Sequence, residues 1–216
     1  KVKIQYNRHE MHLFTGSSHP ALAQALSKEL GVELGDIDLK NFSCGERYVK
    51  YKETIRGKDV YIIQTATNNS DADLMQLFLM CQAAKLSFAE TVHVIIPNFP
   101  YARQDRVSEP REPISSKLVA HLLEESGADH VITLDLHSSQ IQGFFSIPVD
   151  ALSAHAIFAD YFRSKNLSNA VVVSPDAGGA KRAKKFADMI DADLAIIHKS
   201  RPQHPEAEVI ELVGDV

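Results

Sequence analysis

The chain has 216 residues, 44% of them hydrophobic, and a formal net charge of -5, a composition typical of a globular protein with one or two domains. The negative charge argues against nucleic acid as a partner, because nucleic-acid binders carry a basic face. No stretch approaches the roughly 20 apolar residues that span a bilayer, and the N-terminus lacks the apolar core of a signal peptide. Two cysteines without CxxC spacing favour a reducing, cytoplasmic setting.

Apolar runs alternate with amphipathic stretches along nearly the whole chain. Strands are predicted at residues 11–16, 60–66, 91–99, 130–136, 170–177, 194–200 and 208–214. Helices are predicted at residues 19–31, 72–87, 114–127, 153–165 and 178–191. Several strands are continuous Val/Ile/Leu runs, as expected when helices cover both faces of a sheet. The alternation predicts right-handed βαβ units and a mainly parallel α/β sheet.

Two segments, 92–106 and 170–185, share the order of an apolar strand, a proline, a short turn and a basic stretch. If this is a duplication, it predicts two similar α/β lobes with a boundary near Val149 to Ser153. The expected domains are therefore residues 1–150 and 151–216.

The first polar segment follows the strand at 91–99 and contains Arg103 and Gln104. A guanidinium group suits bidentate contacts with phosphate and stacking on a base. A solvated charged loop is the other interpretation, and it is favoured for Arg106 and Arg111 individually.

The second segment begins with Asp135 and His137 at the end of the strand at 130–136. Ligands of open α/β sheets bind just outside the carboxyl ends of the strands, where a carboxylate and an imidazole can meet a metal or a phosphate. The local alternative is that Asp135 caps the turn and His137 packs nearby.

The third segment, residues 174–179, joins a strand to a helix through Gly178 and Gly179. The glycines allow close backbone approach, and the helix N-terminus offers N–H groups to an anion. Asp176 then stands where a carboxylate can hold Mg²⁺, which prefers oxygen ligands. A plain turn with an aspartate cap is the alternative.

The fourth segment carries Lys199 and Arg201 at the mouth of a strand, followed by the polar run 203–208. Such a pair suits a mobile cationic lid that neutralises charge during phosphoryl transfer, although the same spacing is common on ordinary surfaces. The four segments together favour Mg²⁺–phosphate chemistry.

These segments are where the chain resembles the ribose-phosphate pyrophosphokinase (phosphoribosyl-pyrophosphate synthetase) family. The stretch from Asp135 to Asp150, with its Gln-Ile-Gln-Gly-Phe-Phe core, is similar to the family signature at every motif position. Further similarity lies at residues 16, 20–23, 56–60, 101–106, 111–114, 174–179, 199–202 and 214–216. The resemblance covers nearly the whole chain.

The resemblance implies two phosphoribosyltransferase-type lobes with mainly parallel sheets flanked by helices, the second lobe incomplete, in homohexamers built from dimers. It implies attack of the ribose 5-phosphate 1-hydroxyl on the β-phosphorus of ATP, with release of AMP. The resemblance implies that His137 and Asp176 associate with Mg²⁺ and that Arg103, Gln104 and His137 contact ATP. Phe42 and Glu46 are expected to contact the nucleotide of a neighbouring subunit. Lys199 and Arg201 are expected to be the lid cations, and Arg201 also to bind substrate.

Two departures from the family pattern bear on activity. Cys44 stands where the family usually has aspartate, and a thiol cannot replace a carboxylate acceptor, so ATP binding is expected to weaken. The chain stops at Val216, where the family continues into a loop that cradles the ribose 5-phosphate. We therefore expect either a piece of a longer enzyme or a truncated, non-catalytic homologue that acts as a regulatory or associated subunit. A phosphoribosyltransferase fits less well, because it needs the same loop but not the signature at 135–150.

Overall fold

The computed structural model describes residues 11–200 and 208–214. The chain divides into two compact units, Lys1–Leu152 and Ser153–Val216. In the described part of the chain no helix is both long and apolar enough to cross a membrane.

The first unit is built on a five-stranded sheet with the order β1-β4-β5-β6-β7, in which every neighbouring pair is parallel. Its strands are β1 (Met11–Thr15), β4 (Asp59–Ile63), β5 (Thr91–Ile95), β6 (His130–Leu134) and β7 (Val149–Leu152). The mainly parallel α/β sheet predicted from the sequence is confirmed.

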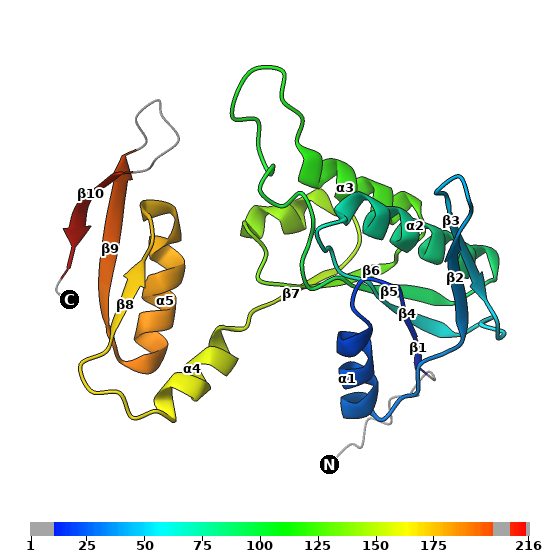
Figure 1. Ribbon diagram of the computed structural model, residues 1–216, viewed down its shortest axis with the longest axis horizontal. Coiled ribbons are helices and arrows are strands. Elements are labelled where there is room, and N and C mark those ends of the chain that lie inside the picture. Colours follow the sequence, from blue (N-terminus) through cyan, green and yellow to red (C-terminus); the bar gives the residue numbers. More distant parts are fainter. Residues whose placement is uncertain (1–10, 201–207, 215–216) are drawn as a thin grey trace, which may run out of the picture. The chain divides into compact units, whose positions relative to one another are not determined.

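Helices flank both faces of this sheet (Figure 1): α2 (Ser70–Leu86) and α3 (Ser115–Glu125) lie on one face, and α1 (Pro20–Leu30) on the other. Leu34, which follows α1, bridges Leu13 of β1 in parallel. After β1 the chain passes through α1 to Leu34, which lies along one edge of β1. It then reaches β4, which pairs with the other edge of β1. Right-handed crossovers in opposite directions put the helices on opposite faces, and the strands follow one another across the sheet in chain order, β1-β4-β5-β6-β7.

The main core lies between the sheet and the α2–α3 layer. Alternate strand residues point into it, including Val60, Ile62, Val92, Val94 and Val131, all with no exposed surface. They pack with Leu77, Met80 and Cys81 of α2, a helix that is apolar around most of its circumference, as expected for a helix packed on more than one side.

The opposite face of the sheet carries Tyr61, His93 and His130 on successive strands. The rings of Tyr61 and His93 stack at 4.2 Å, and the Nδ1 atoms of His93 and His130 lie 3.0 Å apart. Burial, with the neighbouring His130, lowers the pKa of His93, while the carboxylates of Asp59 and Asp129 oppose that shift.

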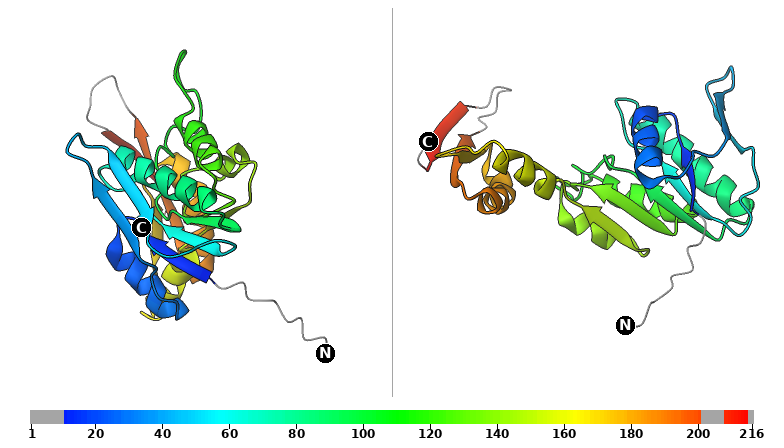
Figure 2. Two further views of the ribbon diagram at one scale, coloured as in Figure 1. Left: turned by 90° about the vertical axis from the view of Figure 1, so that its right-hand side faces the viewer. Right: turned by 90° about the horizontal axis from the view of Figure 1, so that it is seen from below.

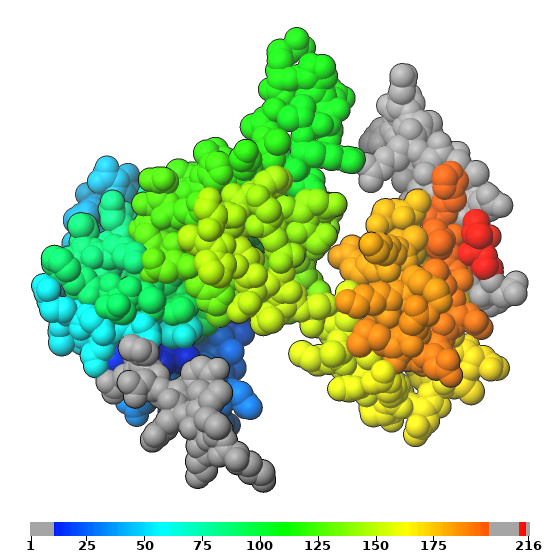
Figure 3. Space-filling view, turned by 180° about the vertical axis from the view of Figure 1, so that it is seen from behind, coloured from blue at the N-terminus to red at the C-terminus, as the bar shows by residue number. Residues whose placement is uncertain are grey.

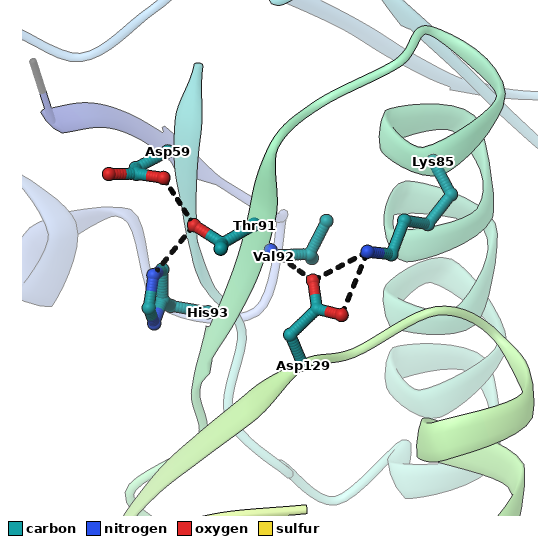
Figure 4. A network of polar contacts seen from close by, with 6 residues as sticks. All are labelled: Asp59, Lys85, Thr91, Val92, His93 and Asp129. Atoms are coloured by element: carbon teal, nitrogen blue, oxygen red, sulfur yellow. Dashed lines mark hydrogen bonds and ion pairs between the residues drawn. The ribbon is translucent and has the colours of Figure 1, made fainter. Parts of the chain in front are cut away.

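Two polar contacts fasten the strand starts (Figure 4). In the first, the Thr91 hydroxyl forms hydrogen bonds with the Asp59 carboxylate and with the His93 ring. In the second, Asp129 accepts from the Lys85 ammonium at 2.6 and 2.8 Å and from the Val92 amide at 2.7 Å. Asp129 thus ties the end of α2 to β5 and to the start of β6.

A two-stranded antiparallel hairpin, β2 (Ile37–Asn41) and β3 (Arg47–Tyr51), is an element that the sequence analysis missed. Its base packs on α2, where the Tyr51 hydroxyl donates to the Met80 carbonyl at 3.0 Å. Burial raises the pKa of Tyr51. The rest of the hairpin projects from the body of the first unit (Figure 2).

The second unit holds a three-stranded sheet of order β10-β9-β8, in which β8 and β9 are parallel and β9 and β10 antiparallel. Its elements are α4 (His155–Arg163), β8 (Val171–Ser174), η2 (Ala177–Gly179), α5 (Ala180–Ile190), β9 (Asp193–Ser200) and β10 (Glu208–Val213). Within this sheet only β10 is antiparallel to its neighbour.

Candidate functional site

Two of the polar segments singled out in the sequence leave from neighbouring strand ends. β5 and β6 are adjacent and parallel, and the Leu134 amide donates to the Pro97 carbonyl at 3.2 Å just beyond them. The chain after β5 carries Arg103 and Gln104, and the chain after β6 carries His137. The sheet therefore brings both segments to its carboxyl edge, where open α/β sheets bind ligands.

The segment after β5 opens with a tight turn over residues 101–104. Tyr101 adopts a left-handed conformation (φ 56°), and the Gln104 amide donates to its carbonyl at 3.0 Å. The Tyr101 hydroxyl donates to the Asp71 carboxylate, a contact that raises the pKa of Tyr101. The Gln104 carbonyl accepts from the Ser116 amide and hydroxyl at 3.2 and 2.9 Å. Arg103 and Gln104 expose their side chains between these two attachments.

Beyond the turn the chain forms a long loop that stands out from the surface of the first unit (green in Figure 3). Its own Glu112 carboxylate closes it, accepting from the Ser108 and Glu109 amides at 3.0 and 2.9 Å. Arg106 and Arg111 are exposed, as expected for a solvated charged loop.

The segment after β6 separates apolar from polar residues. Ile141 of η1 (Ser139–Phe144) is fully buried, and Phe145 packs edge-on against Phe99 at 5.8 Å. Asp135 has a positive φ of 47°, its amide donates to the Leu152 carbonyl at 2.9 Å, and His137 is exposed. The apolar half of the signature thus anchors the segment in the core and leaves His137 facing solvent.

β1 and β4 are neighbouring parallel strands, and the space beyond their carboxyl ends is also a place where open α/β sheets bind ligands. Here the protein's own amides fill it. The Gln76 Oε1 atom accepts from the Ser17 amide (2.8 Å), the Ser17 hydroxyl (2.9 Å) and Gln64 Nε2 (2.9 Å), and Gln64 Oε1 accepts from the Ser18 amide (3.1 Å). A Cβ atom at Gly16 would lie 2.1 Å from Gln64 Oε1, so a larger residue there would displace the Gln64 side chain from its network.

Phe42 and Glu46 lie at the tip of the β2–β3 hairpin, where the Phe42 amide donates to the Glu46 carbonyl at 2.8 Å. Gly45, with φ 94°, makes the turn. Phe42 is half exposed, and Cys44 beside it is also exposed. The tip of the hairpin projects away from the five-stranded sheet, so these side chains are accessible to another molecule.

Asp176 follows β8 in the second unit and caps the next helix through Oδ1, which accepts from the Gly179 amide at 2.8 Å. The Ser174 hydroxyl donates to the Asp176 carbonyl at 2.7 Å. Asp176, Arg182 and His155 line a cavity of about 360 Å³ together with the phenylalanines of α4 and α5. The helix cap and the accessible carboxylate are both present at this turn.

Lys199 belongs to β9, but its side chain, like the whole of Arg201, lies outside the described residues. Their roles as lid cations stay predictions. His137 belongs to the first unit and Asp176 to the second.

Across residues 11–200 and 208–214, no three His, Cys, Asp or Glu side chains gather closely enough to hold a metal ion by themselves. Mg²⁺ needs no such group, because proteins often hold it through one or two carboxylates, water and substrate phosphates. The Asp176 carboxylate fits that role. The His137 imidazole is a softer ligand and suits a contact with phosphate oxygens better.

The geometry defines an α/β protein with cationic and carboxylate side chains just after the carboxyl ends of parallel strands, the edge at which such sheets bind ligands. Residues 11–127 match the model of the N-terminal domain of ribose phosphate pyrophosphokinase. The chain belongs to the ribose-phosphate pyrophosphokinase family.

Relatives support this assignment over almost the whole chain. A Bacillus caldolyticus ribose-phosphate pyrophosphokinase is 48% identical over 97% of this chain, and Saccharomyces cerevisiae ribose-phosphate pyrophosphokinase 4 is 49% identical over 94%. The crystal structure of phosphoribosylpyrophosphate synthetase from Mycobacterium smegmatis superposes with a TM-score of 0.88 at 39% identity, over 94% of this chain and 67% of that one. The chain spans 66% and 64% of the lengths of the two curated relatives.

Proposed function

We propose that the protein transfers the β,γ-diphosphate of Mg-ATP to the 1-hydroxyl of ribose 5-phosphate, giving phosphoribosyl pyrophosphate and AMP. The hydroxyl oxygen forms the new bond to the β-phosphorus, the bond from that phosphorus to the oxygen bridging the α-phosphate breaks, and the hydroxyl proton is released. The observation that carries the proposal is the pair of polar segments at the adjacent ends of β5 and β6, in a chain of this family.

Arg103 and Gln104 are the ATP contacts of the first unit. Both side chains are exposed on a turn attached to α2 and α3, so they are accessible to the nucleotide. A guanidinium group can pair with phosphate or stack on the adenine. His137, exposed at the end of the next strand, can donate a hydrogen bond to a phosphate oxygen.

Asp176 is the residue that would hold Mg²⁺, since one of its oxygens caps the helix and a carboxylate has a second oxygen for a cation. Magnesium, when bound, would supply positive charge that offsets the charge of the phosphate groups. Lys199 and Arg201 would neutralise the charge that builds up on the transferred group, and Arg201 would also contact the sugar phosphate.

Phe42 and Glu46 would act in trans. Their position on a projecting hairpin supports contact with the nucleotide of a neighbouring subunit, and so a homo-oligomer built from dimers. The proposed setting is the cytoplasm.

A second candidate, a non-catalytic homologue that associates with active subunits, is favoured by Cys44. This thiol is exposed at the hairpin tip and replaces the usual carboxylate. Replacing it (Cys44→Asp) should tighten Mg-ATP binding by about tenfold if the lost contact is a charge-assisted hydrogen bond. Unchanged affinity would remove Cys44 as an argument for this candidate.

The decisive experiment incubates the protein with Mg-ATP in the presence and absence of ribose 5-phosphate. Catalysis requires AMP and phosphoribosyl pyrophosphate to form only when the sugar phosphate is present. Lys199→Ala should then lower kcat by orders of magnitude with little change in ATP affinity, because its charge acts in the transition state. ATP binding without AMP release in any condition would support the second candidate instead.

A further inference from the structure

The turn that presents Arg103 and Gln104 is fastened at both ends. At its far end the Gln104 carbonyl accepts two hydrogen bonds from Ser116, a residue with no exposed surface at the start of α3. At its near end the Tyr101 hydroxyl reaches across to Asp71 in the first turn of α2. The two candidate ATP contacts, Arg103 and Gln104, therefore lie in a short turn that is attached to both α2 and α3.

The attachment on α2 is itself rigid. The Asp73 carboxylate accepts from the Thr67 amide at 2.9 Å and from the Thr67 hydroxyl at 2.6 Å, and Gln64 Nε2 donates to the Asp73 carbonyl at 3.1 Å. Asp73 is 7% exposed and Gln64 1%. Because this buried network holds the first turn of α2, Asp71 offers Tyr101 an acceptor with a defined position.

We propose that Tyr101 and Asp71 are positioning residues, which together hold Arg103 and Gln104 in the geometry that binds the nucleotide. This inference rests on the function proposed above. Neither residue is assigned contact with ATP. They act by reducing the number of conformations that the turn must give up when the nucleotide binds.

The exposure of the pair separates this role from a contribution to folding. Tyr101 is 41% exposed and Asp71 is exposed as well, so loss of their contact leaves no polar group buried without a partner. Exposed polar contacts of this kind add little to stability. Removing the contact should therefore reduce the order of the turn and leave the stability of the fold almost unchanged.

The test compares Tyr101→Phe, Asp71→Ala and the double variant by calorimetric titration with Mg-ATP. Each single variant should weaken binding by about three- to tenfold, since an exposed hydrogen bond to a carboxylate contributes less than a buried one. The double variant should be no weaker than either single one, because both changes remove the same contact. Asp71→Asn keeps a neutral acceptor and should therefore bind Mg-ATP more tightly than Asp71→Ala does.

Tyr161→Phe is the matched control, because it removes an exposed tyrosine hydroxyl in the second unit. It should leave affinity unchanged, and thermal unfolding should be the same for all variants. Hydrogen exchange without nucleotide gives an independent measurement: the Gln104 amide, which donates to the Tyr101 carbonyl, should exchange faster in Tyr101→Phe than in the wild type.

The outcomes are distinguishable. Wild-type protein that fails to bind Mg-ATP overturns the proposed function, whereas faster exchange at Gln104 would still support the attachment of the turn. If Tyr101→Phe binds Mg-ATP as tightly as the wild type does, the positioning role is overturned. Affinity losses that multiply in the double variant overturn it as well, and so does failure of Asp71→Asn to bind more tightly than Asp71→Ala.

Discussion

Replacing Gln76 by leucine should destabilise the first unit, because this side chain is the acceptor at the centre of the polar network between β1 and β4. Gln76 is 1% exposed, and its Oε1 accepts from the Ser17 amide, the Ser17 hydroxyl and Gln64 Nε2 at 2.8–2.9 Å. Leucine has a similar size but accepts no hydrogen bond. The change therefore tests the network with little change in packing.

The expected loss follows from the number of bonds broken. Each hydrogen bond contributes about 1 kcal/mol net, and a donor left buried without a partner costs about 1–3 kcal/mol. Ser17 lies at the surface and can turn to water, and Gln64 Nε2 keeps its bond to the Asp73 carbonyl, which limits the penalty. We expect a loss of about 2–3 kcal/mol, equivalent to a Tm lower by about 5–10 °C for a chain of this length.

Thermal unfolding followed by circular dichroism measures the change, since the chain has no tryptophan to report by fluorescence. Gln82→Leu is the control: it makes the same substitution on the same helix, at an exposed position, and should change stability by about 0.5 kcal/mol or less. If Gln76→Leu is as stable as the wild type, or if Gln82→Leu loses as much, the network does not stabilise the fold as argued.

Two further predictions concern titration and thiol reactivity. Because the pKa of His93 in the folded protein lies below its ordinary value of 6.5, the unfolded chain binds more protons between the two values. The free energy of unfolding should be highest above about pH 6.5 and fall as the pH drops toward the folded-state pKa. In urea unfolding at pH 5 to 8, His93→Gln should make this free energy depend less on pH. An equal dependence in both proteins would contradict the assignment. Cys81 is fully buried and burial raises its pKa to about 12, whereas Cys44 is exposed. A thiol reagent should therefore modify one cysteine per native chain and two after denaturation; rapid modification of both in native protein would show that the α2 core opens readily.

The sequence predicted most of the elements because hydrophobic periodicity is a local signal. The continuous apolar runs at β4, β5 and β6 and the amphipathic patterns of α1 and α3 were recognised within a few residues of their ends. The strands are shorter than the predicted runs: β4 ends at Ile63, β5 at Ile95 and β6 at Leu134.

The elements that were missed carry weaker local signals. The β2–β3 hairpin has only five residues in each strand, and the adjacent Tyr48 and Val49 interrupt the alternation of apolar and polar residues in β3. The alternation in Ile37–Asn41, the turn at Gly45 and the paired pattern in Arg47–Tyr51 could have identified it. The four residues of β7 are too few to show a period.

The sequence by itself determined most of the helices and strands, and it placed Arg103, His137 and Asp176 just after strands, because such patterns need only neighbouring residues. Only the tertiary structure decided which strand ends are adjacent, that amides fill the space between β1 and β4, and that Tyr101 meets Asp71, 30 residues away. The physical reason is that these contacts depend on strand order and on packing between distant segments, and no pattern within a short stretch of chain encodes either.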